Sequence, residues 1–190
     1  MRFGKYLRPQ NQIIKSDEFI LRPISYEDRY RIMKWRNDQL YHLRQKAPLD
    51  QKTQDDYFLN VVAQLFQQEY PNQMLFSLDR DEMHIAYGGL VHIDWKKAYA
   101  ELSFVMNTDF EALFFETFWA TFLKMIEPIA KALGIKILYT AAYDLRPQLY
   151  TVLEKNNFQR KENIEDYTRF INQGDIVVHA KTLTNGYEEA

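Results

Sequence analysis

The segment His84-Ile-Ala-Tyr-Gly-Gly-Leu-Val-His-Ile-Asp-Trp-Lys-Lys-Ala-Tyr-Ala-Glu-Leu-Ser-Phe-Val-Met106 decides the fold of this chain. Two apolar, β-forming runs flank a polar turn at Asp94 to Lys97, so the segment predicts a long β-hairpin. The second run leads directly into a long apolar helix. A strand that feeds a helix is a common phosphate site, because the first backbone N–H groups of the helix have no partner within it. The helix entry that follows, Asn107 to Thr117, contains no glycine.

The composition fits a single globular domain. With 190 residues and 46% apolar content, the chain can bury one core. We expect an N-terminal extension at residues 1–18, the domain at 19–184 and a tail at 185–190. A formal charge of −2 provides no overall field to attract nucleic acid. The N-terminus lacks a signal-peptide core, and no apolar run approaches bilayer length. We therefore expect a cytoplasmic protein with neither a nucleic-acid nor a membrane partner.

Metal and thiol chemistry have little support in the sequence. The chain has no cysteine, which excludes disulfides, thiolate metal sites and a cysteine nucleophile. Its four histidines lie at positions 42, 84, 92 and 179 and show none of the spacings typical of zinc sites. We therefore expect no metal cofactor.

The apolar periodicity predicts alternating strands and helices. Ser25 and Asp28 form a capping-box pattern at the start of the first helix. The expected strands are 19–24, 74–78, the two halves of 84–106, 135–142, 158–160, 167–171 and 175–183. The expected helices are 26–36, 50–70, 110–133 with a kink at Pro128, and 145–156.

Four motifs, in the same order and spacing, resemble those of the GCN5-related N-acetyltransferase (GNAT) family, in the branch that acetylates amino sugars or ribosomal-protein N-termini. The matching segments are Ile20-Leu21-Arg22-Pro23, Trp35-Arg36-Asn37-Asp38, Gly88 to Trp95 with Ala100-Glu101-Leu102, and Leu153 to Phe158. The resemblance spans residues 19 to 183. It implies an α/β (α+β) fold, with about four helices around a single mixed, mostly antiparallel sheet of about six to seven strands.

The resemblance also implies acetyl-coenzyme A as co-substrate. In this family its pantetheine arm adds like a strand beside the fourth strand, here along the backbone of Phe104, Val105 and Met106. The pyrophosphate would meet the helix start at Ala112, Leu113 and Phe114. Relatives have a glycine-rich turn there with an arginine or glutamine, whereas this chain has no glycine or arginine and carries Asp109, Glu111 and Glu116. The loop is therefore divergent.

Arg146 takes the place of an asparagine found in relatives. Its charge could reach the cofactor phosphates, or it could be an ordinary exposed arginine before Pro147.

Two residues are candidates for acid–base chemistry. Glu101 matches a family glutamate and could take a proton from the acceptor amine, directly or through water. The alternative is a strand glutamate paired with a cation or a backbone group. The tyrosine with which relatives protonate the leaving thiolate aligns with Leu153. Tyr150, three residues earlier, could replace it or could be a core tyrosine.

The acceptor side would use the first two helices and the hairpin. Trp35, Arg36 and Asn37, with Asp94 and Trp95, supply aromatic, cationic and carboxylate groups that could orient a small-molecule amine. Alternatively, Trp35 anchors the helix to the core, while Asp94 and Trp95 only shape a turn.

Three hypotheses follow. The first is an N-acetyltransferase acting on a small primary amine, with a nucleotide-linked amino sugar preferred over a protein N-terminus. The second is a GNAT-fold binding module without catalysis. The third is an enzyme that uses a different acyl donor. A homodimer is left open.

Overall fold

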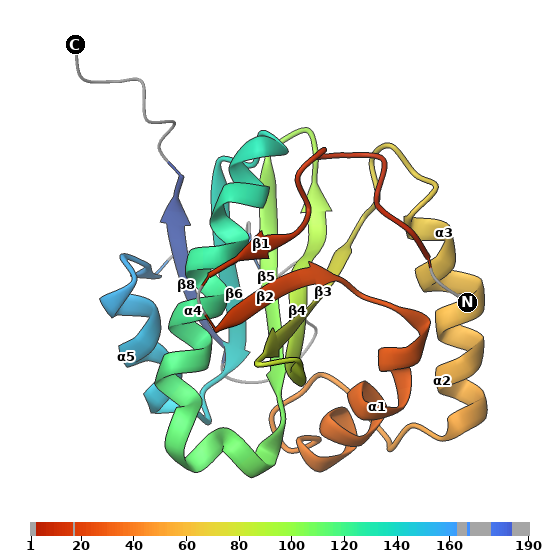
Figure 1. Ribbon diagram of the computed structural model, residues 1–190. Helices are drawn as coiled ribbons and strands as arrows, with labels where there is room; N and C mark the ends of the chain where they lie inside the picture. The colour runs from red at the N-terminus through yellow and green to blue at the C-terminus, as the bar shows by residue number, and fades with distance from the viewer. Residues whose placement is uncertain (1–2, 17, 163–166, 168–175, 184–190) are drawn as a thin grey trace.

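One mixed sheet of eight strands organises the computed structural model, which describes residues 3–16, 18–162, 167 and 176–183 (Figure 1). The strands are β1 (Ile14–Lys15), β2 (Phe19–Pro23), β3 (Met74–Arg80), β4 (Met83–Asp94), β5 (Tyr99–Met106), β6 (Ile137–Tyr143), β7 (Gln159–Lys161) and β8 (Ile176–Thr182). Their spatial order is β1-β2-β3-β4-β5-β6-β8-β7. All neighbours are antiparallel except β5 and β6. The predicted fold class is confirmed, although the sheet has more strands than expected.

Four helical segments flank the sheet in the described part of the chain. Short 3₁₀ turns precede two of them, and the second segment is composite. The helices are η1 (Tyr26–Asp28) with α1 (Arg29–Asp38), α2 (Gln51–Tyr57) with η2 (Phe58–Val62) and α3 (Ala63–Leu65), η3 (Thr108–Phe110) with α4 (Glu111–Ala132), and α5 (Pro147–Lys155). Figure 1 shows α4 crossing the front of the sheet beside α5, with α1, α2 and α3 on the opposite side of the molecule.

The long helix α4 holds the core together. Its apolar residues recur at helical spacing, and Phe122 and Leu123 are fully buried. Each such side chain stabilises the fold by about 1.5–3 kcal/mol. Gly88 lets α4 approach the sheet, because a Cβ there would lie 3.0 Å from the Phe122 ring and 2.2 Å from the Ser103 carbonyl oxygen. The helix continues through Pro128.

Segment η2 is a π-helix, which interrupts an otherwise α-helical segment. Before it, Tyr57 lines a pocket described below. After it, Leu65 and Phe66 are buried in the core. π-Segments are rare and frequently lie at functional sites.

The N-terminal extension is part of the fold rather than an appendage. The Tyr6 ring stacks on Phe66, with ring centroids 4.1 Å apart. Its hydroxyl donates to the Leu75 carbonyl at 3.2 Å and accepts from the Leu75 N–H at 2.7 Å. Gln12 is buried and bonds to both backbone groups of Tyr6, and β1 pairs with β2. The strand β1 partly explains why the sheet is wider than predicted.

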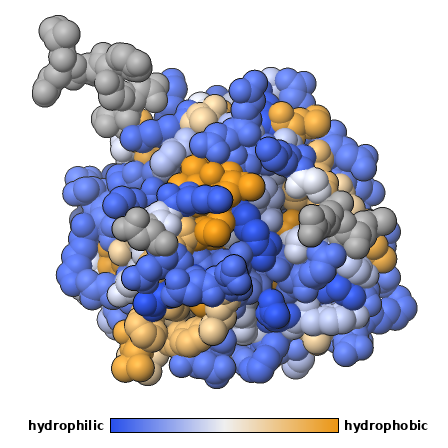
Figure 2. Space-filling view, viewed as in Figure 1, coloured by the Kyte–Doolittle hydropathy of each residue, from blue (hydrophilic) through white to orange (hydrophobic). Residues whose placement is uncertain are grey.

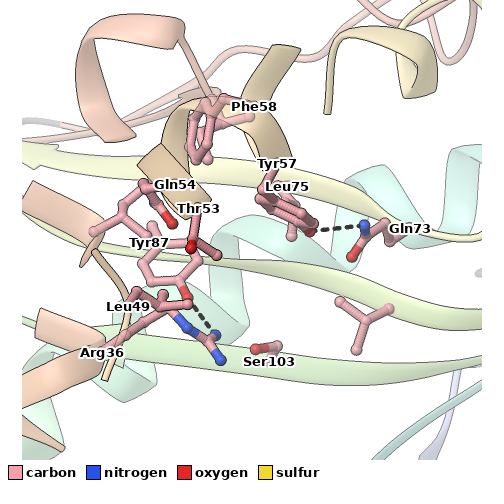
Figure 3. Close-up of a pocket in the computed structure, with 13 residues that line it drawn as sticks. Arg36, Leu49, Thr53, Gln54, Tyr57, Phe58, Gln73, Leu75, Tyr87 and Ser103 are labelled. Atoms are coloured by element: carbon pink, nitrogen blue, oxygen red, sulfur yellow. Dashed lines mark hydrogen bonds between the residues drawn. The ribbon is translucent and has the colours of Figure 1, made fainter. Parts of the chain in front are cut away.

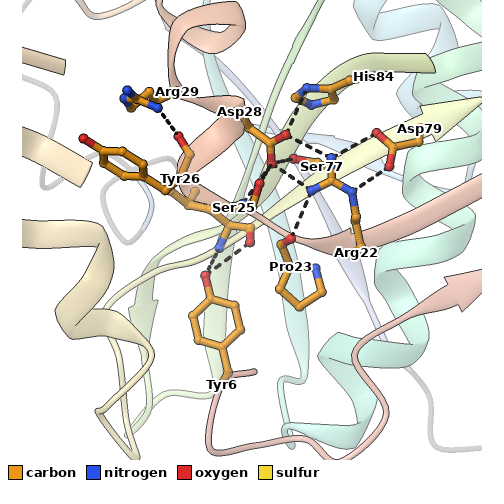
Figure 4. Close-up of polar contacts among 11 residues, drawn as sticks. Tyr6, Arg22, Pro23, Ser25, Tyr26, Asp28, Arg29, Ser77, Asp79 and His84 are labelled. Atoms are coloured by element: carbon orange, nitrogen blue, oxygen red, sulfur yellow. Dashed lines mark hydrogen bonds and ion pairs between the residues drawn. The ribbon is translucent and has the colours of Figure 1, made fainter. Parts of the chain in front are cut away.

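A buried polar cluster ties the first helix to the sheet (Figure 4). Arg22 on β2 donates to both oxygens of Asp28, at 2.8 and 2.9 Å, and pairs with Asp79 at 2.6 Å. The Asp28 carboxylate also accepts from the Ser25 N–H and from the Ser77 hydroxyl, both at 2.8 Å. Burial alone would raise the pKa of Asp28, but these partners hold it well below its ordinary value. The cluster fixes the start of α1, as the capping-box pattern predicts.

Of the remaining predictions, the strand expected at 167–171 and the tail at 185–190 lie outside the described residues, except for Tyr167. Strand β8 occupies most of the segment predicted at 175–183.

Candidate active site

The parallel strands β5 and β6 separate soon after they meet. Their register covers only Tyr99 to Glu101 on β5, opposite Ile137 to Tyr139 on β6. Beyond this point a cleft of about 100 Å³ opens between them, which we call the strand cleft. Its lining comes from both strands, from α4 and α5, and from the loop after α1: His42, Leu43, Arg44, Glu101, Leu102, Ser103, Phe104, Trp119, Thr140, Ala141, Ala142, Tyr143, Arg146 and Leu149.

Glu101 lies at the closed end of the strand cleft, where the two strands part. It is 3% exposed. Arg44 donates to its Oε1, and Nδ1 of His92 lies 2.6 Å from its Oε2. His92 adopts the left-handed backbone conformation, with φ of 48°, at an irregularity in the pairing of β4. Few non-glycine residues adopt this conformation, and it accompanies the contact between the imidazole and Glu101.

The backbone of β5 alternates between its two sides. The Asn107 N–H donates to β4 at 2.8 Å, which fixes the phase of the ladder. The backbone groups of Val105 therefore also face β4, while those of Phe104 and Met106 face the strand cleft. Gln39 already donates to the Met106 carbonyl at 2.7 Å. Of the predicted cofactor strand, Phe104 and the Met106 N–H thus offer the free edge, and Val105 does not.

The start of α4, where a pyrophosphate was expected, is acidic and partly apolar. Leu113 is 82% exposed, and Figure 2 shows apolar surface gathered over this end of the helix. Ala112 and Leu113 line a shallow hollow with Glu111 and Glu116, while Phe114 stacks on Phe118 at 5.3 Å. The first turn keeps the favourable helix dipole but surrounds it with carboxylates.

Arg146 points into the strand cleft but is already engaged. Its side chain is 7% exposed, and its Nη2 lies 2.5 Å from Glu111 Oε1. Its guanidinium lies over the Phe115 ring, 4.8 Å from the centroid, and its Nη1 lies 3.0 Å from His42 Nε2. Burial, together with the charge of Arg146, lowers the pKa of His42 to about 4, so His42 is neutral and can accept this bond.

Tyr150 lies away from the strand cleft. Its hydroxyl donates to Asp144 at 2.9 Å, and its ring stacks on His179 at 5.2 Å. Burial and Asp144 raise the pKa of Tyr150 to about 12. The helix α5 presents Leu149 to the cleft instead. The acid role of Tyr150 therefore stays a prediction that this geometry does not favour.

A second pocket, of about 290 Å³, lies between α1, α2 and the sheet (Figure 3). We call it the acceptor pocket. Ser103 on β5 lines both this pocket and the strand cleft, so the two hollows border the same residue. Its lining is Ile24, Ile32, Arg36, Leu49, Thr53, Gln54, Tyr57, Phe58, Gln73, Leu75, Tyr87, Val91 and Ser103.

Of the five predicted acceptor residues, Arg36 alone lines this pocket among the described residues. Trp35 is 3% exposed and packs edge-on against His84, as a core anchor does. Asn37 bonds to both backbone groups of Leu49 at 2.8 Å and so shapes the pocket wall.

The last two predicted acceptor residues belong to the turn of the hairpin. Asp94 accepts from the backbone N–H groups of Lys96 and Lys97, at 3.1 and 3.0 Å. Trp95 donates to the Pro71 carbonyl at 3.0 Å. The structure therefore does not bring Asp94 and Trp95 together with Arg36.

Several site residues have no signal in the sequence. His42 and Arg44 belong to a loop without periodicity, and Ser103 is an ordinary strand residue. His92 does have a signal, because the predicted hairpin places it beside Glu101 on the neighbouring strand. Within the described chain no group of three or more His, Cys, Asp or Glu residues could hold a metal ion. None of the helices described is long and apolar enough to cross a membrane.

None of the curated proteins matches significantly. The solved spermidine N-acetyltransferase from Vibrio cholerae, in complex with CoA and spermine, superposes with a TM-score of 0.69 at 14% identity, covering 88% of this chain and 97% of that one. The acetyltransferase that modifies the N-terminal serine of ribosomal protein L7/L12, from Salmonella typhimurium, gives 0.70 at 13% identity, covering 91% and 100%. These likenesses establish the fold.

A family model extends the comparison from fold to family. The model of the acetyltransferase (GNAT) domain matches residues 21–173, which is most of the chain. Its span includes both strands of the cleft and the whole acceptor pocket. This chain belongs to the GNAT acetyltransferase domain family.

Proposed function

We propose that this protein is an N-acetyltransferase that moves an acetyl group from acetyl-CoA to a primary amine of a small molecule, by direct attack in a ternary complex. A nucleotide-linked amino sugar is the first acceptor to test. One observation carries the proposal: Ser103 lines both the acceptor pocket and the strand cleft. An amine in one hollow can therefore approach a thioester in the other.

The fit to acetyl-CoA differs along the cofactor. The free edge of β5 at Phe104 matches a pantetheine arm, whose amides would pair with the strand backbone. The acidic start of α4 fits a diphosphate less well. When bound, acetyl-CoA supplies the activated acetyl group.

The residues of the chain would hold the reactants and move protons. The Phe104 or Met106 N–H is placed to donate to the thioester carbonyl as negative charge develops there. The amine nitrogen bonds to the carbonyl carbon, the carbon–sulfur bond breaks, and the thiolate leaves with the bonding electrons. The amine proton must pass to a base, and we assign this step to Glu101, through water. Arg44 and His92 each bond to one of its two carboxylate oxygens.

The test has two stages. Acetyl-CoA should raise the melting temperature of the purified chain, since a ligand that binds the native state stabilises it. An amine panel should then release thiol. Stabilisation without turnover on any amine would favour the alternative of a binding module, which the engagement of Arg146 by Glu111 supports. No stabilisation at millimolar acetyl-CoA would refute the proposal.

A protein N-terminus is a second candidate acceptor. Its support is the solved L7/L12 acetyltransferase, a fold likeness at 13% identity. Including an N-terminal serine peptide in the amine panel tests it directly.

A further inference from the structure

Arg36 differs from most other arginines of the described chain. Six arginines form ion pairs with carboxylates: Arg8, Arg22, Arg29, Arg44, Arg80 and Arg146. Arg36 instead bonds to neutral groups. Its Nε donates to Gln45 Oε1 at 2.7 Å, and its Nη1 donates to the Tyr87 hydroxyl at 2.8 Å. For Nη2, the described residues provide no partner.

The positive charge of Arg36 is therefore uncompensated within the acceptor pocket. The lining of the pocket contains no aspartate or glutamate among the described residues. The neighbouring Tyr87 hydroxyl raises the pKa of Arg36, which stays charged at all working pH values. Figure 3 shows the guanidinium directed toward the Ser103 end of the pocket.

We propose that Arg36 binds an anionic group, a carboxylate or a phosphate, on the amine acceptor, and that the pocket rejects polyamines. The inference rests on the proposed function, because it names the acceptor class of the same site. A guanidinium that retains an unused N–H edge is suited to a planar carboxylate or a phosphate. A polyamine would place further positive charge against Arg36 without a carboxylate to offset it.

The pairing also bears on the chemistry. The acceptor's own anion would favour the ammonium ion over the nucleophilic neutral amine, and the charge of Arg36 offsets that effect. The pocket volume of about 290 Å³ limits the acceptor to a small molecule or to the amine-bearing end of a larger one. The anion and the amine must therefore lie close together on the acceptor.

The test compares matched acceptors that differ in the anion. The pairs are glucosamine 6-phosphate with glucosamine and alanine with alaninamide, and spermidine is the cationic probe. Binding is followed by thermal stabilisation in the presence of CoA, and turnover by thiol release from acetyl-CoA. The charged member of at least one pair should exceed its neutral partner by about tenfold or more. Which pair responds distinguishes phosphate from carboxylate.

Variants separate recognition from structure. Arg36→Gln should lower kcat/KM for the charged acceptor about ten- to hundredfold and for its neutral partner by less than about threefold, because one charged hydrogen-bonded contact is lost. Arg36→Lys should recover part of the difference. Arg31→Gln, which removes an exposed cation from the same helix, is the matched control and should change neither value.

Three results would overturn the inference: equal response to the members of both pairs, spermidine as the best ligand, or an equal loss for charged and neutral acceptors in Arg36→Gln. Its failure is separable from that of the proposed function. Stabilisation by a charged probe that Arg36→Gln abolishes supports the inference even without turnover. Absence of stabilisation by either charged probe overturns it, even if acetyl-CoA binds.

Discussion

Arg36 in the acceptor pocket and Arg146 in the strand cleft are both partly or fully buried cations, yet their surroundings differ. Arg146 is neutralised by Glu111 and shielded by His42 and Phe115. Arg36 bonds only to neutral side chains among the described residues. The difference teaches that an arginine facing a pocket can bind an anionic ligand when no carboxylate of the protein is paired with it. Among the described residues, Arg36 is such a cation in the acceptor pocket, whereas Arg146 in the strand cleft is paired with Glu111.

The largest effect is expected at Glu101, which lies in the strand cleft near Ser103. Glu101→Gln removes the proposed base and should lower acetyl transfer by at least about 100-fold. Stabilisation by acetyl-CoA should persist, because the edge of β5 is unchanged. Steady-state thiol release and thermal denaturation measure the two quantities.

A matched change controls for folding. Arg44→Gln removes the ion-pair partner of Glu101 but leaves the carboxylate in place. It should cost less activity than Glu101→Gln. Equal rates in wild type and Glu101→Gln would remove the base assignment.

A second substitution would leave Arg146, like Arg36, without a paired carboxylate. Glu111→Gln releases Arg146 and removes one negative charge where the diphosphate is expected. Affinity for CoA should rise by about tenfold, equivalent to about 1.4 kcal/mol, and become more sensitive to salt. The free protein should lose stability, because a buried charge loses its partner. Isothermal titration of CoA at two salt concentrations measures the first effect.

Glu116→Gln is its control, since it removes the same charge from an exposed pair with Lys155. It should change CoA affinity by less than about threefold. Weaker CoA binding by Glu111→Gln would show that Glu111 positions Arg146 for the cofactor instead of withholding it.

The smallest expected effect concerns pH at the cofactor side. The pKa of His42 is about 4 in the folded chain, below the ordinary histidine value of 6.5. Between these values the unfolded chain binds more protons, so the free energy of unfolding falls as pH falls from about 6.5 to 4. After allowance for partial exposure, His42 contributes on the order of 1 kcal/mol to this loss.

His42→Gln should therefore flatten the pH dependence of urea unfolding. His84 and His179, whose pKa values burial also lowers, contribute in the same direction and remain in both proteins. Only the difference between the two proteins is diagnostic. Identical pH profiles would show that His42 protonates freely in the native state.

Much of the fold could be predicted, because its strands and helices follow from the local spacing of apolar residues. In the hairpin at 84–106 the apolar residues are those of β-strands, and in 110–133 they recur at helical spacing. The structure forms strands and a helix there and buries these side chains. Glu101 was singled out by its match to a family glutamate, and the structure places it where β5 and β6 part. The position of the N-terminal extension was not predicted, because Tyr6 is held by a hydrogen bond to Leu75, which is 69 residues away in sequence.

The site was less predictable because its members meet through tertiary structure. Arg44 reaches Glu101 from a loop without periodicity. The spacing of Tyr150 from Leu153 left two alternatives open, a place near the site or a place in the core. However, Leu149 and Leu153, four residues apart, form the buried face of α5. Tyr150 follows Leu149 by one residue, about 100° around the helix, so it faces elsewhere.

The π-helix η2 divides its helical segment into two parts whose side chains follow separate registers and make different contacts. Tyr57 before it serves the acceptor pocket, while Phe66 after it receives Tyr6. A π-segment amounts to one residue inserted in a helix. Deleting a residue within 58–62 would turn everything beyond it by about 100° relative to the pocket wall. A chain one residue shorter here would therefore keep the pocket wall only by losing the stacking of Tyr6 on Phe66.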